Sequence, residues 1–194
     1  MRRTVGLSSA LLFTLGMIAC GEKPAEEAPL AEAAAPAAEP AAPMAMPADW
    51  IHADDAAKTV TLDIVAGKDA TNNNWNFNGY ANGNATVTVP EGYAVTINFT
   101  NNDANMAHSI GVTAKPTGPF SATPDVTPAF AGGMSSNPAS MTDATKMGAT
   151  ESVKFTAATA GDYTLACFVP GHATSGMWIN LKVVAGAPTA TLGM

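Results

Sequence analysis

The chain has 194 residues, 47% of them hydrophobic, and a formal net charge of −7. Because proteins that bind nucleic acid neutralise its phosphates with Lys and Arg, this acidity argues against a nucleic-acid partner. It favours instead a docking protein with a basic patch, toward which an acidic surface would be steered.

The N-terminus has the pattern of an export signal. Two arginines precede an apolar run from Val5 to Ala19, which is typical of a signal peptide rather than a membrane-spanning helix. The stretch Met17–Cys20 resembles a bacterial lipobox. We therefore expect residues 1–19 to be a lipoprotein signal peptide and Cys20 to carry a lipid. Ordinary cleavage nearby, without a lipid, is the alternative.

A lipid on Cys20 would anchor the protein at a bacterial membrane, facing the periplasm or the exterior. Gly21 in the second mature position does not retain a lipoprotein at the inner membrane under the usual sorting rule, so the outer membrane is one option. The rest of residues 20–48 consists almost entirely of Ala, Pro and Glu, with too few large apolar side chains for a core. We expect an extended, disordered tether there.

Residues 49–194 are enough for one compact domain. Within them, apolar and polar residues alternate with the period of two that is typical of half-buried strands. Turn-forming Asn, Gly, Pro and Asp residues separate these runs. The pattern predicts an all-β, two-sheet antiparallel sandwich. The expected strands are 59–65, 85–89, 92–100, a run around Val153 and Phe155, 162–168 and 178–184.

Two segments do not follow this pattern. Residues 113–148 are rich in Pro, Gly, Ser, Ala and Met, and we expect an irregular insertion there, with short helical turns or an elaborated functional loop. Asn residues cluster over residues 72–84. Because Asn tolerates left-handed backbone conformations, an elaborate turn is favoured there over a direct contact with a functional site.

Metal-binding residue types lie at the end of the strand expected over 162–168 and in the segment that follows it. The sequence reads Cys167-Phe-Val-Pro-Gly-His172-Ala-Thr-Ser-Gly-Met177, with a thiol, an imidazole and a thioether spaced five residues apart. The Pro-Gly pair must break the strand, because proline cannot continue a ladder. The returning chain would place His172 and Met177 beside the thiol before the next strand begins at Trp178.

These donor types favour copper. Two His and one Cys in a trigonal arrangement, with a weak axial Met, form a mononuclear type 1 ("blue") copper site for electron transfer. Zinc is the alternative, but structural zinc sites usually have four Cys and His ligands and seldom a methionine. Because the donor set suits both Cu(I) and Cu(II), it predicts electron transfer rather than hydrolysis.

The second imidazole must come from elsewhere in the chain. His108 follows a polar turn and begins an expected short apolar strand, so it is our candidate. His52 competes, but it lies beside the tether, where a solvated role is favoured. We expect Ser109 to hydrogen-bond across to the Cys167 loop. The residues expected to exclude water and raise the reduction potential are Phe168, Pro170 and Trp178.

The number of cysteines supports a metal-bound thiol. If Cys20 carries the lipid, Cys167 is the only thiol of the folded domain and cannot form a disulfide within the chain. An unpaired cysteine is a liability in an oxidising compartment unless it is buried or bound to a metal. Taken singly, a Cys, His or Met more often has a structural role, and it is the joint spacing that favours a ligand set.

With these residues identified, the chain resembles the cupredoxins, and among them most the sulfocyanin family. The resemblance covers roughly residues 58–185 and rests on the stretch 167–178 and on Asn-Trp-Asn-Phe-Asn-Gly-Tyr at 74–80. The ligand spacing is also that of rusticyanin. The resemblance implies a Greek-key β-sandwich of about eight strands. It also implies that one copper ion is bound by His108, Cys167, His172 and Met177.

The resemblance has implications for function as well. Members of the family pass single electrons in respiratory chains, commonly between a quinol-oxidising complex or cytochrome and a terminal oxidase. We therefore expect a lipid-anchored, monomeric, non-enzymatic one-electron carrier whose partner is a cytochrome or a terminal oxidase. The lipid anchor departs from the archaeal pattern of a membrane helix, which leaves the identity of the partner open.

Two other functions stay open. A copper-handling protein would buffer or deliver the ion, with Met134, Met141 and Met147 of the long loop as extra copper(I) donors or as a docking patch. Gap filling or an exposed loop position is the commoner role for such methionines. A copper enzyme would need a second copper centre, usually with more histidines than the three in this chain, and is disfavoured.

Overall fold

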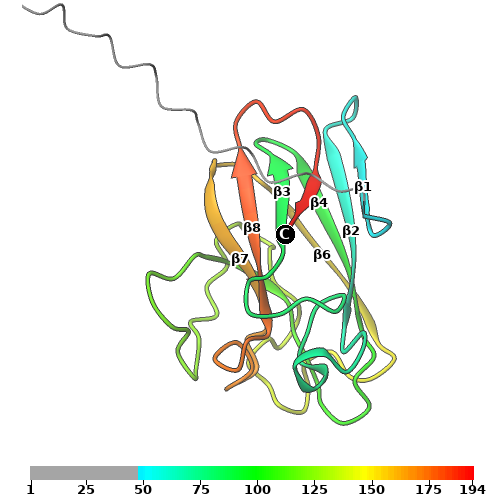
Figure 1. Cartoon of the computed structure of the whole chain (residues 1–194), viewed down its shortest axis with the longest axis vertical. Coiled ribbons are helices and arrows are strands. Elements are labelled where there is room, and N and C mark those ends of the chain that lie inside the picture. Colours follow the sequence, from blue (N-terminus) through cyan, green and yellow to red (C-terminus); the bar gives the residue numbers. More distant parts are fainter. Residues whose placement is uncertain (1–47) are drawn as a thin grey trace, which may run out of the picture. The chain divides into compact units, whose positions relative to one another are not determined.

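The structure, a computed structural model, describes residues 48–194. Within this region nine strands form two sheets around one main hydrophobic core, and no α-helix is present (Figure 1). The strands are β1 Ile51–Asp54, β2 Thr59–Ala66, β3 Thr86–Pro90, β4 Ala94–Asn101, β5 Gly111–Ala114, β6 Thr150–Thr156, β7 Gly161–Ala166, β8 Trp178–Val184 and β9 Thr191–Gly193. The predicted all-β sandwich is therefore confirmed.

The chain passes back and forth between the two sheets. One sheet has the order β1-β2-β4-β6 and the other has the order β5-β7-β8-β3-β9. The pairs β2–β4 and β3–β8 are parallel, so the predicted antiparallel pairing is wrong for them. Because β3 lies in the opposite sheet, the chain reverses twice between β2 and β4 and returns beside β2 in the same direction.

Alternating side chains of the strands fill the core. Val60, Leu62 and Ile64 of β2 are buried, while the residues between them are partly exposed. The register places Leu62 opposite Ile97 and Ile64 opposite Phe99. Burying each such side chain contributes about 1.5–3 kcal/mol. This rigid core carries the loops that form the candidate site.

Long loops gather at one end of the sandwich, the lower end in Figure 1. The longest is the predicted insertion, in which residues 115–149 contain turns and bends but no helix, so the expected short helical turns are absent. Backbone bridges tie it to the segment before and within β5, from Thr145 to His108 and from Met134 to Gly111. The insertion is therefore attached next to a predicted metal ligand.

Candidate metal centre

The turn between β7 and β8 brings three predicted site residues together. Cys167 N donates to Met177 O at 3.1 Å, and Met177 N donates to His172 O at 3.0 Å, which closes the loop. Gly176 has φ +95°, and a Cβ at this position would lie 2.1 Å from Asn82 Oδ1, so a larger residue does not fit. The predicted return of the chain is confirmed.

His108 reaches the same place from the segment between β4 and β5. Its N–H donates to Thr145 O at 3.0 Å in an isolated bridge, and β5 begins only at Gly111. The expectation that His108 begins this strand is therefore wrong, because the insertion pairs with the chain first. The imidazole of His108 is fully buried. The competing His52 is exposed and pairs with Asp63 Oδ2 at 3.0 Å.

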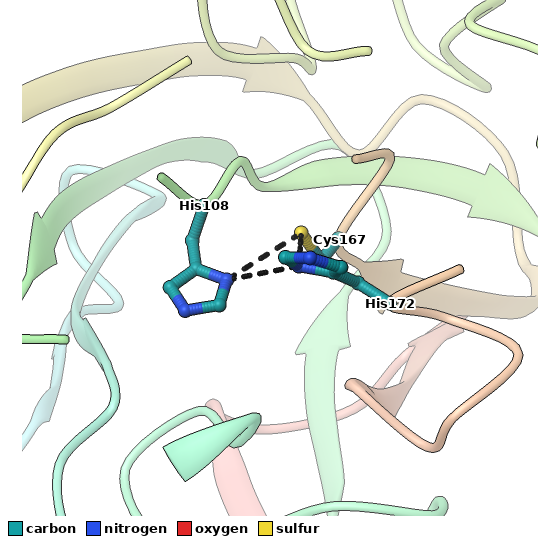
Figure 2. Close-up of side chains that lie close together, drawn as sticks. All are labelled: His108, Cys167 and His172. Carbon is teal, nitrogen blue, oxygen red and sulfur yellow. Dashed lines mark hydrogen bonds between the residues drawn. The ribbon is translucent and has the colours of Figure 1, made fainter. Parts of the chain in front are cut away.

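Figure 2 shows the side chains of His108, Cys167 and His172 turned toward one another. His108 Nδ1 lies 3.1 Å from His172 Nδ1, and Cys167 Sγ lies 3.4 Å from His172 Nδ1 and 3.9 Å from His108 Nδ1. The point equidistant from these three atoms is about 2 Å from each, close to the length of a bond between a metal ion and an imidazole nitrogen. The three donors are thus spaced to hold one metal ion.

Met177 is buried beside this triangle of donors. Its side chain is inaccessible to solvent and belongs to the main core, as does Cys167. The two main-chain hydrogen bonds of the loop fix its backbone next to both Cys167 and His172. A weak axial thioether would have to come from such a position. Its role as a ligand stays a prediction.

Ser109 makes the hydrogen bonds that the sequence predicts. Its Oγ accepts from Phe168 N at 2.8 Å, and its own N–H donates to Cys167 Sγ at 3.4 Å. The Ser109 hydroxyl lies 3.6 Å from the same sulfur. These contacts join the segment between β4 and β5 to the Cys167 loop. They hold the thiol in place and supply polar hydrogens to its sulfur.

Burial shifts the pKa values of the three donor side chains. Burial raises the pKa of the Cys167 thiol, so this thiol has to lose its proton when a metal binds. Burial, followed by the nearby His108, lowers the pKa of His172 to about 4. Burial also lowers the pKa of His108, and Asp103 opposes only part of that effect. Both imidazoles are therefore neutral at pH 7 and have a nitrogen lone pair to offer.

A buried carboxylate, Asp103, contacts the site and was not identified from the sequence. Its Oδ2 lies 2.9 Å from His108 Nε2, and both side chains are nearly inaccessible to solvent. Burial alone would raise the pKa of Asp103, but hydrogen bonds from Asn105 N and from His108 bring it below its ordinary value. The sequence pattern indicated only a polar turn at this position.

The Asn-rich segment forms the predicted elaborate turn and also touches the site. Asn72, Asn73 and Asn74, in the short 3₁₀ turn η1 (Thr71–Asn74), all have positive φ. The turn presents Trp75, whose ring stacks on the His172 imidazole with centroids 4.2 Å apart. The amide of Asn72 donates to Ser175 O at 2.9 Å, which joins the turn to the ligand loop. This contact with the site was not favoured from the sequence.

A second buried asparagine, Asn76, organises the same turn. Its Nδ2 donates to Asp69 O and Thr71 O, and its Oδ1 accepts from Lys68 N and Gly79 N. Every hydrogen-bonding site of this amide is used, so the side chain replaces regular strand pairing inside the turn. These hydrogen bonds therefore fix the backbone of the turn next to Trp75.

Other residues singled out by the sequence analysis have simpler positions. Phe168 is buried, and Trp178 is partly buried against Phe120 with ring centroids 5.5 Å apart. Met134 packs with this smaller apolar cluster, which fits gap filling. Met141 and Met147 are 60% and 63% exposed. Their positions match the roles that the sequence favoured, an exposed loop and a filled gap.

The family model for the sulfocyanin (SoxE) domain matches residues 47–191. Sulfocyanin of Sulfolobus acidocaldarius is 32% identical over 129 residues, which are 64% of this chain and 63% of that protein. Rusticyanin of Acidithiobacillus ferrooxidans is 35% identical over 102 residues, 52% of this chain and 61% of that protein. Each match spans less than two thirds of the relative.

Solved cupredoxin structures are also similar to the chain. A rusticyanin structure from Thiobacillus ferrooxidans is 21% identical with a TM-score of 0.43, covering 66% of this chain and 82% of that one. A dithionite-reduced auracyanin from Roseiflexus castenholzii is 24% identical with a TM-score of 0.43, covering 64% of this chain and 96% of that one. The family match extends over nearly all of the described residues. The chain therefore belongs to the sulfocyanin family of cupredoxins, a family that binds one copper ion.

Proposed function

We propose that this protein is a one-electron carrier that holds a single copper ion between His108, Cys167, His172 and Met177. The observation that carries the proposal is the buried triangle of two imidazole nitrogens and one sulfur. Bound copper would supply the change between Cu(II) and Cu(I). Soft sulfur donors beside imidazoles suit both oxidation states.

The burial of the donors supports electron transfer over catalysis. His108 and Cys167 are 0% exposed and His172 is 1% exposed, so a substrate molecule could not reach an ion held between them, whereas an electron could. Within residues 48–194, only this one group of three His, Cys, Asp or Glu residues is spaced to hold a metal. A copper enzyme would need a second centre or an open coordination position.

The same burial bears on the copper-handling alternative. A protein that delivers copper has to release the ion readily to an acceptor, and enclosed ligands oppose that release. The exposed Met141 and Met147 are the observation in favour of the alternative. Rapid transfer of copper(I) to an acceptor, together with slow electron exchange with a cytochrome, would favour delivery over electron transport.

We further propose that the carrier works in a membrane-associated respiratory chain, with a cytochrome or terminal oxidase as partner. The expected signal peptide of residues 1–19, the lipid on Cys20 and the tether of residues 20–48 support a membrane anchor. All of these residues except 48 lie outside the described part of the chain. The part of the chain that the structure describes, residues 48–194, contains no helix with the length and hydropathy of a membrane span. The acidic composition fits a partner with a basic docking patch.

The visible spectrum of the copper-loaded protein tests the proposed centre. Addition of Cu(II) should produce an intense band from charge transfer between the Cys167 thiolate and copper. Cys167→Ser should bind copper weakly and lack the band, because a hydroxyl cannot replace the thiolate. Stoichiometric copper binding by the unaltered protein without this band would overturn the proposal.

A further inference from the structure

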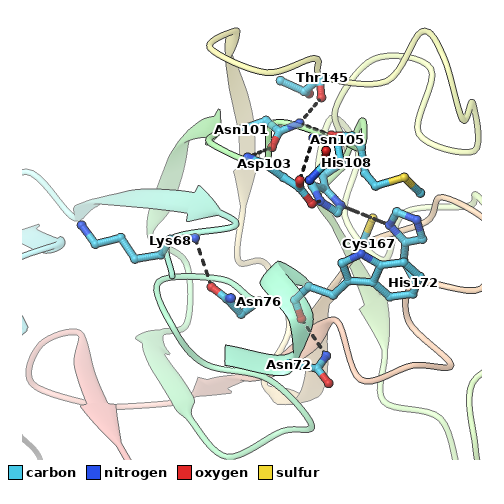
Figure 3. A network of polar contacts seen from close by, with 12 residues as sticks. Lys68, Asn72, Asn76, Asn101, Asp103, Asn105, His108, Thr145, Cys167 and His172 are labelled. Carbon is cyan, nitrogen blue, oxygen red and sulfur yellow. Dashed lines mark hydrogen bonds and ion pairs between the residues drawn. The ribbon is translucent and has the colours of Figure 1, made fainter. Parts of the chain in front are cut away.

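Asp103 is a charged side chain enclosed at the edge of the candidate centre. It is 3% exposed, and its Oδ2 lies 2.9 Å from His108 Nε2 (Figure 3). Within residues 48–194, the neutral His108 ring is the only basic side chain within ion-pair distance of Asp103, and no Lys or Arg neutralises it. Burying a carboxylate without a neutralising cation costs folding free energy. This cost indicates that Asp103 has a role at the neighbouring metal ligand.

The carboxylate is held rigidly by its own turn. Its Oδ1 accepts from Asn105 N at 2.9 Å, and Asp103 N donates to Asn101 Oδ1 at 2.8 Å. Asn101 Nδ2 in turn donates to Thr145 O at 2.8 Å, the same carbonyl oxygen that accepts from His108 N. One connected network therefore fixes both the carboxylate and the backbone of the imidazole that it contacts.

This contact determines which nitrogen of His108 is free. An ionised carboxylate only accepts hydrogen bonds, so the proton between the two groups must be on His108 Nε2. The lone pair is then on Nδ1, the atom that lies 3.1 Å from His172 Nδ1 and 3.9 Å from Cys167 Sγ. His108 is thus in the metal-binding tautomer before an ion arrives.

The charge also affects the oxidation state of a bound ion. Reduction of a bound Cu(II) ion to Cu(I) would add one electron and remove one positive charge from a centre that would also contain the Cys167 thiolate. A fixed negative charge behind His108 favours the more positive state, Cu(II). The low accessibility of the pair limits screening by water and salt.

We propose that Asp103 is a positioning residue of the copper centre that keeps the His108 proton on Nε2 and lowers the reduction potential. The inference rests on the proposed copper site. It assigns a function to a turn that the sequence marks only as polar. It also implies that the potential of this carrier is set partly by a charge outside the ligand set.

Voltammetry of copper-loaded Asp103→Asn tests the effect of the charge. Asn has nearly the same shape and can still accept a hydrogen bond from His108 Nε2, but it carries no charge. The reduction potential should therefore rise, and the affinity for copper should fall by about 10- to 100-fold. Asp63→Asn is the matched control, because it removes the same charge from an exposed Asp–His pair with a 3.0 Å separation. Its potential should stay near that of the unaltered protein.

A second measurement does not depend on a variant that folds. Nitrogen NMR of the imidazoles in the metal-free, unaltered protein at neutral pH should show the His108 proton on Nε2. A proton on Nδ1 would overturn the positioning role. An unchanged potential in Asp103→Asn with an intact visible band would overturn the tuning role, whereas absence of that band in the unaltered protein would overturn the proposed function instead.

Discussion

The two imidazoles of the centre have the same chemistry but unlike surroundings. His108 has both ring nitrogens engaged, with Asp103 at Nε2 and the donor triangle at Nδ1. His172 Nε2 is buried without a hydrogen-bond partner among the described residues, and its ring stacks on Trp75. Charge and hydrogen bonds therefore fix one side of the site, whereas aromatic contact covers the other.

This difference indicates a division of roles between the two sides. A hydrogen-bonded and charged neighbour determines tautomer and potential, as argued for Asp103. An apolar stack determines solvent access, because it keeps water from His172 and supplies no hydrogen-bond partner to its ring.

Removal of each imidazole from the metal-free protein should have the largest effect. His108→Ala leaves the buried Asp103 Oδ2 without its hydrogen-bond donor, which costs about 1.5–3 kcal/mol for a hydrogen bond to a charged group. His172→Ala leaves no charge unpaired and loses an aromatic stack worth about 0.5–1.5 kcal/mol beyond its buried area. Urea unfolding with a chelator present should show the larger loss for His108→Ala, and equal losses would contradict the comparison.

Ser109 tests the hydrogen-bonded side with a smaller change. Ser109→Ala leaves the buried Phe168 N–H without an acceptor, which should lower the free energy of unfolding by about 1–3 kcal/mol. Ser121→Ala removes an exposed serine whose Oγ also accepts from a backbone N–H, and its effect should be within about 0.5 kcal/mol. If the two variants unfold at the same urea concentration, the Ser109 contacts do not stabilise the site.

Trp75 tests the aromatic side. Because burial lowers the pKa of His172 to about 4, Trp75→Ala should raise that pKa toward 6.5 by admitting water. Proton NMR titration of the metal-free protein measures the change, which corresponds to about 1.4 kcal/mol per pKa unit. Trp50→Ala is the control, because it removes a partly buried ring that lies near Tyr80 and not against His172. The pKa of His172 should not change in this variant. An unshifted pKa in Trp75→Ala would show that the stack does not exclude water.

The same pKa predicts how stability depends on pH. The pKa of His172 is about 4 when folded and 6.5 without the surrounding protein, so the unfolded chain binds more protons between these values. The metal-free protein should therefore lose stability as the pH falls from about 6.5 to about 4. In Trp75→Ala this part of the pH dependence should be smaller, because the two pKa values lie closer together.

Local patterns revealed much of the fold and three of the four predicted ligands. Cys167, His172 and Met177 lie within one short loop between two strongly alternating strands, so their proximity follows from chain geometry. The long strands were recognisable because alternation reflects burial on one face. Strands β1 and β9 were missed because β1 has a single partly buried residue and β9 has three residues. The parallel pairs depend on sheet crossing, which no local pattern records.

The remaining parts of the site depend on contacts between distant segments. His108 could be proposed because few histidines compete, but its bridge to Thr145 could not be foreseen. Asp103 looks like any turn aspartate until Asn101 and Asn105 fix its direction. Trp75 was visible in the sequence, yet its stack on His172 requires the whole Asn-rich turn. Side-chain direction in irregular segments is set by tertiary hydrogen bonds, which spacing alone does not encode.

X-ray absorption at the copper edge of the copper-loaded protein tests the central claim most directly. The triangle of His108, Cys167 and His172 predicts two nitrogen neighbours and one sulfur neighbour at short distance, and the sulfur should be lost in Cys167→Ser. A copper environment of only nitrogen and oxygen atoms in the unaltered protein would contradict the account.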